Sequence, residues 1–82
     1  MTLTVRAQAL FASCLQPSDR PTPTQVADAI IDSLRDNGGV AGCVATMATE
    51  YGDHPEAAAA RMRWALALAS ASGVFAGAAL AA

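Results

Sequence analysis

Hydrophobic residues recur every three or four positions in four segments of the chain, and short runs rich in proline, glycine and polar residues separate these segments. This spacing places the hydrophobic side chains on one side of an α-helix. No segment alternates hydrophobic and polar residues as a half-buried strand does. The pattern therefore predicts an all-α fold: a compact bundle of four short helices, with a fifth helical segment if the chain turns after Ser72.

The first helix is expected over residues 2–15. Its predicted core-facing residues are Leu3, Ala7, Leu10, Phe11, Cys14 and Leu15. The next segment, residues 16–21, holds two prolines around polar residues, and such a segment cannot continue a helix. We expect a loop there.

The second helix has a clear predicted beginning. Thr22 and Gln25 fit the capping-box pattern, and Pro23 suits the first helical position. Its predicted core-facing residues are Val26, Ile30 and Leu34, with Ile31 beside them. Gly38 is expected to end the helix in a left-handed conformation.

The third helix is expected over residues 40–51. Its predicted buried stripe consists of Val40, Val44, Met47 and Tyr51, which are spaced three or four residues apart. Gly52 is expected to make a sharp turn. Asp53 is then expected to cap the fourth helix, because Glu56 follows three residues later, and Pro55 suits its first turn.

The fourth helix is expected from about His54 through Ser70. Its predicted inner stripe is Ala58, Met62, Ala65 and Ala69, widened by Leu66, while Trp64 and Leu68 lie on a second face. Beyond it, glycines interrupt a run of alanines. We therefore expect one helical domain over residues 1–72 and an Ala/Gly-rich helical extension or tail over residues 73–82.

Composition and charge narrow the function. The chain has 82 residues, a formal net charge of −2, and arginine as its only strong cation, so it lacks the general basic surface of nucleic-acid-binding proteins. Cys14 and Cys43 lie in apolar stretches and are expected to behave as small buried hydrophobic residues. The N-terminus reads as a helix and not as a signal peptide. These features favour a protein of the bacterial cytoplasm.

One segment resembles a known DNA-binding motif. In residues 44–68, Ala48, Gly52, Pro55 and Met62 are spaced as in the helix-turn-helix of bacterial regulators. The resemblance implies that residues 57–63 enter the major groove. The arginines that would then contact DNA are Arg20, Arg35, Arg61 and Arg63. The alternative is an ordinary helical corner, since Asp53 departs from the family pattern and the second helix opens with alanines that cannot read bases.

The chain as a whole is similar to small helical proteins of actinobacteria. The segments that carry this likeness are residues 15–19, 50–56 and 61–64. The resemblance implies a helical fold in a bacterial cytosol, and it implies no activity.

The C-terminal segment suggests a second kind of function. Residues 64–82 carry no charge. The predicted interaction face consists of Trp64, Leu68, Gly73, Phe75 and Gly77, and it would bind a protein partner or a second copy of the chain. A membrane span is disfavoured, because alanine, serine and glycine contribute little to insertion.

Catalytic, metal and cofactor sites are not expected. His54 is the only histidine, and no CxxC, HxxxH or HExxH spacing accompanies it. No glycine-rich phosphate loop occurs, and no nucleophile lies in a recognisable turn. We therefore expect a non-enzymatic binding module.

Three carboxylates, Asp28, Asp32 and Asp36, repeat every four residues in the second helix. We expect a solvated face on which Arg35 lies close to Asp32 and Asp36. The alternative is an acidic surface for a basic partner.

Overall fold

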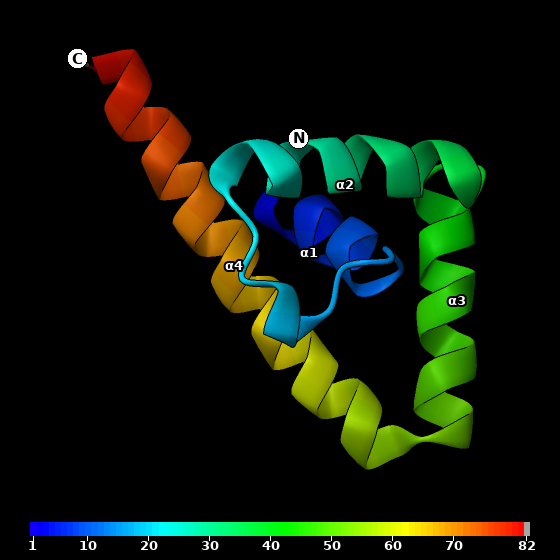
Figure 1. The fold of residues 1–82 in the computed structure, drawn as a ribbon. Helices are drawn as coiled ribbons and strands as arrows, with labels where there is room; N and C mark the ends of the chain where they lie inside the picture. The colour runs from blue at the N-terminus through cyan, green and yellow to red at the C-terminus, as the bar shows by residue number, and fades with distance from the viewer. Residues whose placement is uncertain (82) are drawn as a thin grey trace.

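Four α-helices and one short 3₁₀ turn make up residues 1–81, the part of the chain whose backbone the structure describes (Figure 1). The structure is a computed structural model that describes the backbone of residues 1–81 and the side chains of residues 1–71. The elements are α1 (Leu3–Phe11), η1 (Pro17–Asp19), α2 (Pro23–Asp36), α3 (Val40–Asp53) and α4 (Pro55–Ala81). No strand occurs over this described length, so the predicted all-α fold is confirmed.

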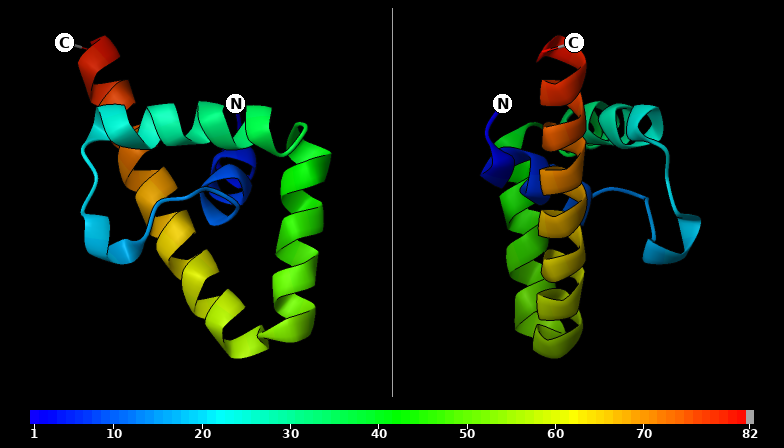
Figure 2. Two further views of the ribbon diagram at one scale, coloured as in Figure 1. Left: turned by 45° about the vertical axis from the view of Figure 1, so that its right-hand side comes forward. Right: turned by 90° about the vertical axis from the view of Figure 1, so that its left-hand side faces the viewer.

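Helix α1 lies between the other three helices. Figure 2 shows α2, α3 and α4 as the sides of a triangle, with α1 passing through its middle. Each of these three helices contacts α1, and the most extensive contact is that of α4. The first helix of the chain is therefore its central core element.

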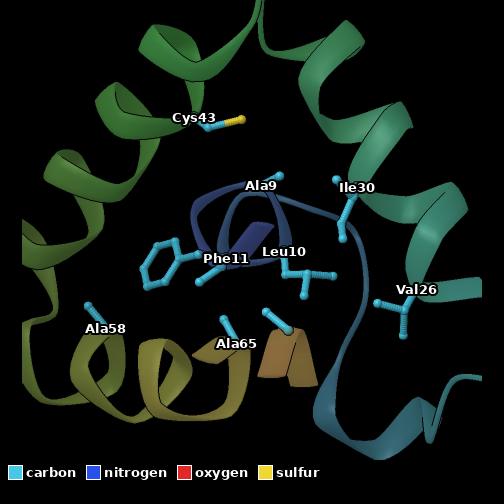
Figure 3. Packing of buried hydrophobic residues seen from close by; sticks show 10 residues of the cluster. Ala9, Leu10, Phe11, Val26, Ile30, Cys43, Ala58 and Ala65 are labelled. Atoms are coloured by element: carbon cyan, nitrogen blue, oxygen red, sulfur yellow. The ribbon is translucent and has the colours of Figure 1, made fainter. Parts of the chain in front are cut away.

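The core is built largely from small side chains (Figure 3). Ala58, Ala65 and Ala69 turn one face of α4 towards α1, and alanine allows the two helices to approach closely. The buried hydrophobic residues of the described core are Ala7, Ala9, Leu10, Phe11, Val26, Ile30, Cys43, Ala58, Ala65 and Ala69. A core of this kind depends on close contact more than on large buried area.

Helix α1 is shorter than predicted. It ends at Phe11, because the carbonyl groups that would continue it bind side chains. The Ser13 hydroxyl donates to the Leu10 carbonyl at 2.6 Å, and Arg61 binds neighbouring carbonyls, as described below. Cys14 consequently lies outside the helix and is exposed. Its predicted burial is wrong, and so is that of Leu3.

Helix α2 begins as predicted. The Gln25 amide donates to the Thr22 hydroxyl at 3.2 Å, and the Thr22 amide donates to the Gln25 side-chain oxygen at 2.8 Å. Val26 and Ile30 are buried. Gly38, with φ 78°, ends the helix in the predicted left-handed conformation, and Gly39 adds a second positive φ of 91°.

Helix α3 buries a different face from the predicted one. Cys43 is 1% exposed, whereas Val40, Val44 and Tyr51 are 41%, 37% and 37% exposed. The cause lies at the corner between α2 and α3, where any side chain at Gly42 would overlap the Asn37 carbonyl. This close contact sets the rotation of α3 about its axis. The predicted buried stripe is therefore wrong for Val40 and Val44, whereas Met47 packs against the core as predicted and Tyr51 stacks on the buried Phe11.

The corner between α3 and α4 also differs from the prediction. Asp53 is the last residue of α3, and His54 alone separates the two helices, with φ −141° and ψ 67°. Gly52 lies within α3 and has no positive φ, so it does not make the turn. Both the turn at Gly52 and the cap at Asp53 were wrong predictions; the extended backbone of His54 changes the chain's direction.

Helix α4 follows the predicted inner stripe. Ala58, Ala65 and Ala69 are buried and Met62 packs against the core, whereas Leu66 is exposed, contrary to expectation. The helix continues without a break across the expected boundary at residue 72 and runs to Ala81, so no separate fifth helix forms within the described backbone. Its last turns extend beyond α2 (Figure 1).

Candidate interaction surfaces

Arg61 points from α4 to the end of α1. Its Nε donates to the Phe11 carbonyl at 2.7 Å, and Nη2 donates to the Ser13 and Leu15 carbonyls at 3.0 and 2.9 Å. A longer bond of 3.4 Å reaches the Leu10 carbonyl. These carbonyls belong to the last turn of α1 and the residues after it, which have no further helical amides to bind. Arg61 therefore caps α1 from another helix.

The surroundings of Arg61 are aromatic as well as polar. Its guanidinium carbon lies 4.8 Å from the centre of the Trp64 ring and 5.8 Å from that of Phe11. Burial lowers the pKa of Arg61, and the nearby Glu50 acts in the opposite direction. The guanidinium remains charged at neutral pH because arginine does not lose its proton in proteins. A half-buried cation with several hydrogen bonds to another helix serves the fold.

The four candidate DNA-contacting arginines have different surroundings. Arg63 is exposed and lies about 200° around α4 from Arg61, because each helical residue turns the chain by about 100°. Arg35 forms ion pairs with Asp32 at 2.8 Å and with Asp36 at 3.5 Å, as predicted. Arg20 is exposed, in a left-handed backbone conformation. The structure therefore does not bring Arg61 and Arg63 to one face.

The aspartates of α2 line a groove. It has a volume of about 750 Å³ and lies between α2 and the segment that follows α1. Asp28, Asp32 and Asp36 form one wall, and Asp19 of η1 adds a fourth carboxylate that the sequence pattern did not reveal. Asp19 also binds the Gln16 amide at 2.8 Å. The groove is acidic and its lining includes no arginine.

An exposed apolar strip runs along α3. We define the α3 stripe as Val40, Val44, Ala48 and Tyr51, all of which are exposed. Val44 lies about 100° around the helix from the buried Cys43. No charged residue occurs from Val40 to Thr49. The two valines thus leave part of their apolar surface uncovered, whereas Met47 packs against the core and the Tyr51 ring stacks on the Phe11 ring with 6.0 Å between their centres.

The sequence contained a sign of this rotation that the hydrophobic pattern concealed. The small residues Gly39, Gly42, Cys43 and Thr46 repeat at three- and four-residue intervals. Such a row permits close approach of another backbone. In the structure the Cys43 sulfur lies 3.7 Å from the Ser33 hydroxyl of α2. The row of small residues marked the core side of α3 better than the valines did.

The predicted interaction face on α4 is only partly described. Trp64 and Leu68 are half-buried and pack against the core, so much of their surface already serves the fold. The side chains of the other three residues, Gly73, Phe75 and Gly77, lie outside the described residues. Among the described residues, the exposed large hydrophobic side chains are Met1, Leu3, Ile31, Val40, Val44, Tyr51 and Leu66, and three of them follow one another along α3.

No metal or membrane-spanning element emerges from the described residues. Among their histidine, cysteine, aspartate and glutamate side chains, no group of three could hold a metal ion. His54 is exposed at the corner between α3 and α4, and both cysteines are free. Within the described part of the chain, no helix has the length and hydropathy that crossing a bilayer requires.

Comparisons with known proteins give no family for this chain. No protein-family model, curated protein or solved structure matches it. The function has to be argued from the surfaces described above.

Proposed function

We propose that this chain is a non-enzymatic protein-interaction module. The observation that carries the proposal is the α3 stripe, an exposed apolar surface along one side of a helix. Scattered exposed hydrophobic residues are normal, but a contiguous apolar strip is typical of a binding surface. Here Val40, Val44 and Tyr51 follow one another along the same side of α3.

The lack of charged residues along most of the α3 stripe supports the same function. Val40, Val44 and Ala48 of the stripe lie in a segment without charged residues, which ends at Glu50 beside Tyr51. The neighbouring α2, in contrast, carries its aspartates and Arg35 on exposed positions. The core of a protein–protein interface is depleted of charge in the same way. The uncharged segment from Trp64 onwards could extend the apolar surface of the molecule along α4.

Nucleic-acid binding has less support. Affinity for DNA comes largely from arginine and lysine on phosphates, and Arg61 is bound to carbonyls of α1 while Arg35 is paired with aspartates. Arg20 and Arg63 are the remaining candidates. Two phosphate contacts would give weak binding that salt abolishes. Retention of random-sequence duplex by the wild-type chain, lost in Arg20→Ala/Arg63→Ala, would favour DNA over a protein partner.

The proposal can be tested by comparing the same substitution at two valines. If Val44 serves binding, Val44→Ser should lower the free energy of unfolding by only about 1 kcal/mol, because Val44 is 37% exposed and loses only part of a buried side chain's contribution. Val26→Ser removes a side chain that is 2% exposed and should cost about 2–4 kcal/mol. Urea denaturation at low micromolar protein concentration measures both.

An equal loss at the two positions would contradict the proposal. Val44 would then be needed by the fold itself, and the α3 stripe would have no surplus apolar surface for a partner. Val40→Ser provides a second variant of the stripe, since Val40 is exposed to a similar extent.

A further inference from the structure

We infer that the partner of the α3 stripe is a second copy of this chain, bound through an antiparallel α3–α3 contact. This inference rests on the proposed function, since it names the partner of the same surface. The inference follows from the charge along the stripe, from the sizes of the side chains that form it and from its length.

Charge favours a self-complementary contact. A twofold axis brings a surface against itself, so every unbalanced charge on that surface meets its own copy. Val40, Val44 and Ala48 of the α3 stripe lie in an uncharged segment that ends at Glu50, so the middle of the stripe avoids this repulsion. The acidic groove is lined by Asp19, Asp28, Asp32 and Asp36. Arg35 pairs with Asp32 and Asp36, but the carboxylates still outnumber this one cation, so the groove would repel itself. Of these two surfaces, only the α3 stripe suits a symmetric dimer.

The side-chain sizes along α3 favour the antiparallel direction. Val40 and Tyr51 lie at opposite ends of the stripe, and Val44 and Ala48 lie between them. With the two helices antiparallel, Val44 packs against Ala48 of the partner subunit, and Val40 packs against Tyr51 of the partner subunit. Each larger side chain then meets a smaller one, and Ala48 permits the short interhelical distance that small residues allow.

The length of the stripe sets the strength of the contact. The fourteen residues of α3 extend about 21 Å at 1.5 Å per residue. A contact of this length is smaller than a standard interface of about 800 Å² per partner. We therefore expect a reversible dimer with a dissociation constant on the order of 10–100 μM, as is typical of small interfaces.

Sedimentation equilibrium of four chains between about 5 μM and 1 mM tests the inference, the range being set by the expected affinity. The wild-type chain should shift from monomer to dimer. Val44→Glu should remain a monomer, because in each chain it buries an unpaired carboxylate against Ala48 of the partner subunit. The matched control is Ile31→Glu. Ile31 of α2 is 59% exposed but lies outside the stripe, so this variant should dimerise like the wild type.

Ala48→Leu separates a specific contact from general stickiness. Leucine adds apolar surface but prevents close approach of the helices, so a specific α3–α3 contact predicts at least a tenfold weaker dimer. Tighter association of Ala48→Leu, or loss of association in Ile31→Glu, would overturn the inference. Circular dichroism and thermal unfolding of each variant confirm that the fold is intact.

The inference and the proposed function fail in different ways. A wild-type chain that stays monomeric at 1 mM overturns the second copy as partner. The comparison of Val44→Ser with Val26→Ser, made at low protein concentration, still decides whether the stability of the fold depends on the side chains of the stripe. Equal destabilisation at the two valines removes the proposed function and the inference together.

Discussion

At the scale of single residues, the side chain of Arg61 makes the most consequential contacts between helices. Its side chain joins α4 to the end of α1 through four carbonyl oxygens. Removal would leave partly buried carbonyls without donors, and hydrogen bonds to a charged group contribute more than neutral ones. We expect Arg61→Ala to lower the free energy of unfolding by about 2–4 kcal/mol. Arg63→Ala, at an exposed position, should stay within about 0.5 kcal/mol, and urea denaturation distinguishes the two.

At the same scale, we expect alanine substitutions at two glycines of α3 to change the stability of the fold in opposite directions. Gly42→Ala places a methyl group on the Asn37 carbonyl and should destabilise the fold by about 1–3 kcal/mol. Gly52 has open space around it and a helical backbone, so Gly52→Ala should stabilise the fold by about 0.5–1 kcal/mol, because alanine is the better helix former. Thermal unfolding of both variants checks the signs. Stabilisation by Gly42→Ala would mean that the corner between α2 and α3 can relax.

At the scale of elements, α4 has two parts with different roles. Its first part supplies Ala58, Ala65 and Ala69 to the core, while its last turns extend past α2 (Figure 1). We expect a chain that ends at residue 72 to keep its thermal midpoint within about 3 °C, since a loss below 0.5 kcal/mol shifts a small domain only slightly. A much lower thermal midpoint would mean that the removed residues contribute contacts to the core.

At the scale of the whole molecule, the same truncation locates the dimer contact. If two copies meet through α3, the chain ending at residue 72 should dimerise as tightly as the full chain, because the α3 stripe is unchanged. If they meet through the uncharged C-terminal part of α4, the truncated chain should stay monomeric. Sedimentation equilibrium of the two chains at equal concentration separates these outcomes.

The acidic groove belongs to the same scale. The carboxylates of Asp19, Asp28, Asp32 and Asp36 line it, so a large part of the negative charge of the chain faces one side. This distribution opposes non-specific contact with nucleic acid on that side. We therefore expect the wild-type chain to bind duplex DNA less than Asp28→Asn/Asp32→Asn/Asp36→Asn does, and we expect added salt to reduce the difference. Gel-shift titration of both chains, begun at low salt, measures it.

The sequence alone determined the helical fold and the local features that depend on near neighbours. The capping box of Thr22 and Gln25, the left-handed Gly38 and the inner stripe of α4 were all predictable, since a helix end or a helical face depends on residues within a few positions. The hydrophobic pattern also identified the valines that now form the α3 stripe. It could not say that they would remain exposed.

Tertiary contacts decided the rest. The end of α1 depends on Arg61, which lies about fifty residues away in the chain, and the side that α3 buries depends on the packing of Cys43 against Ser33 of α2. A pattern of hydrophobic positions gives each helix an apolar side, but only the packed neighbours determine which side is covered. The site that we propose exists because α3 packs most closely through Cys43, which leaves Val40 and Val44 partly uncovered.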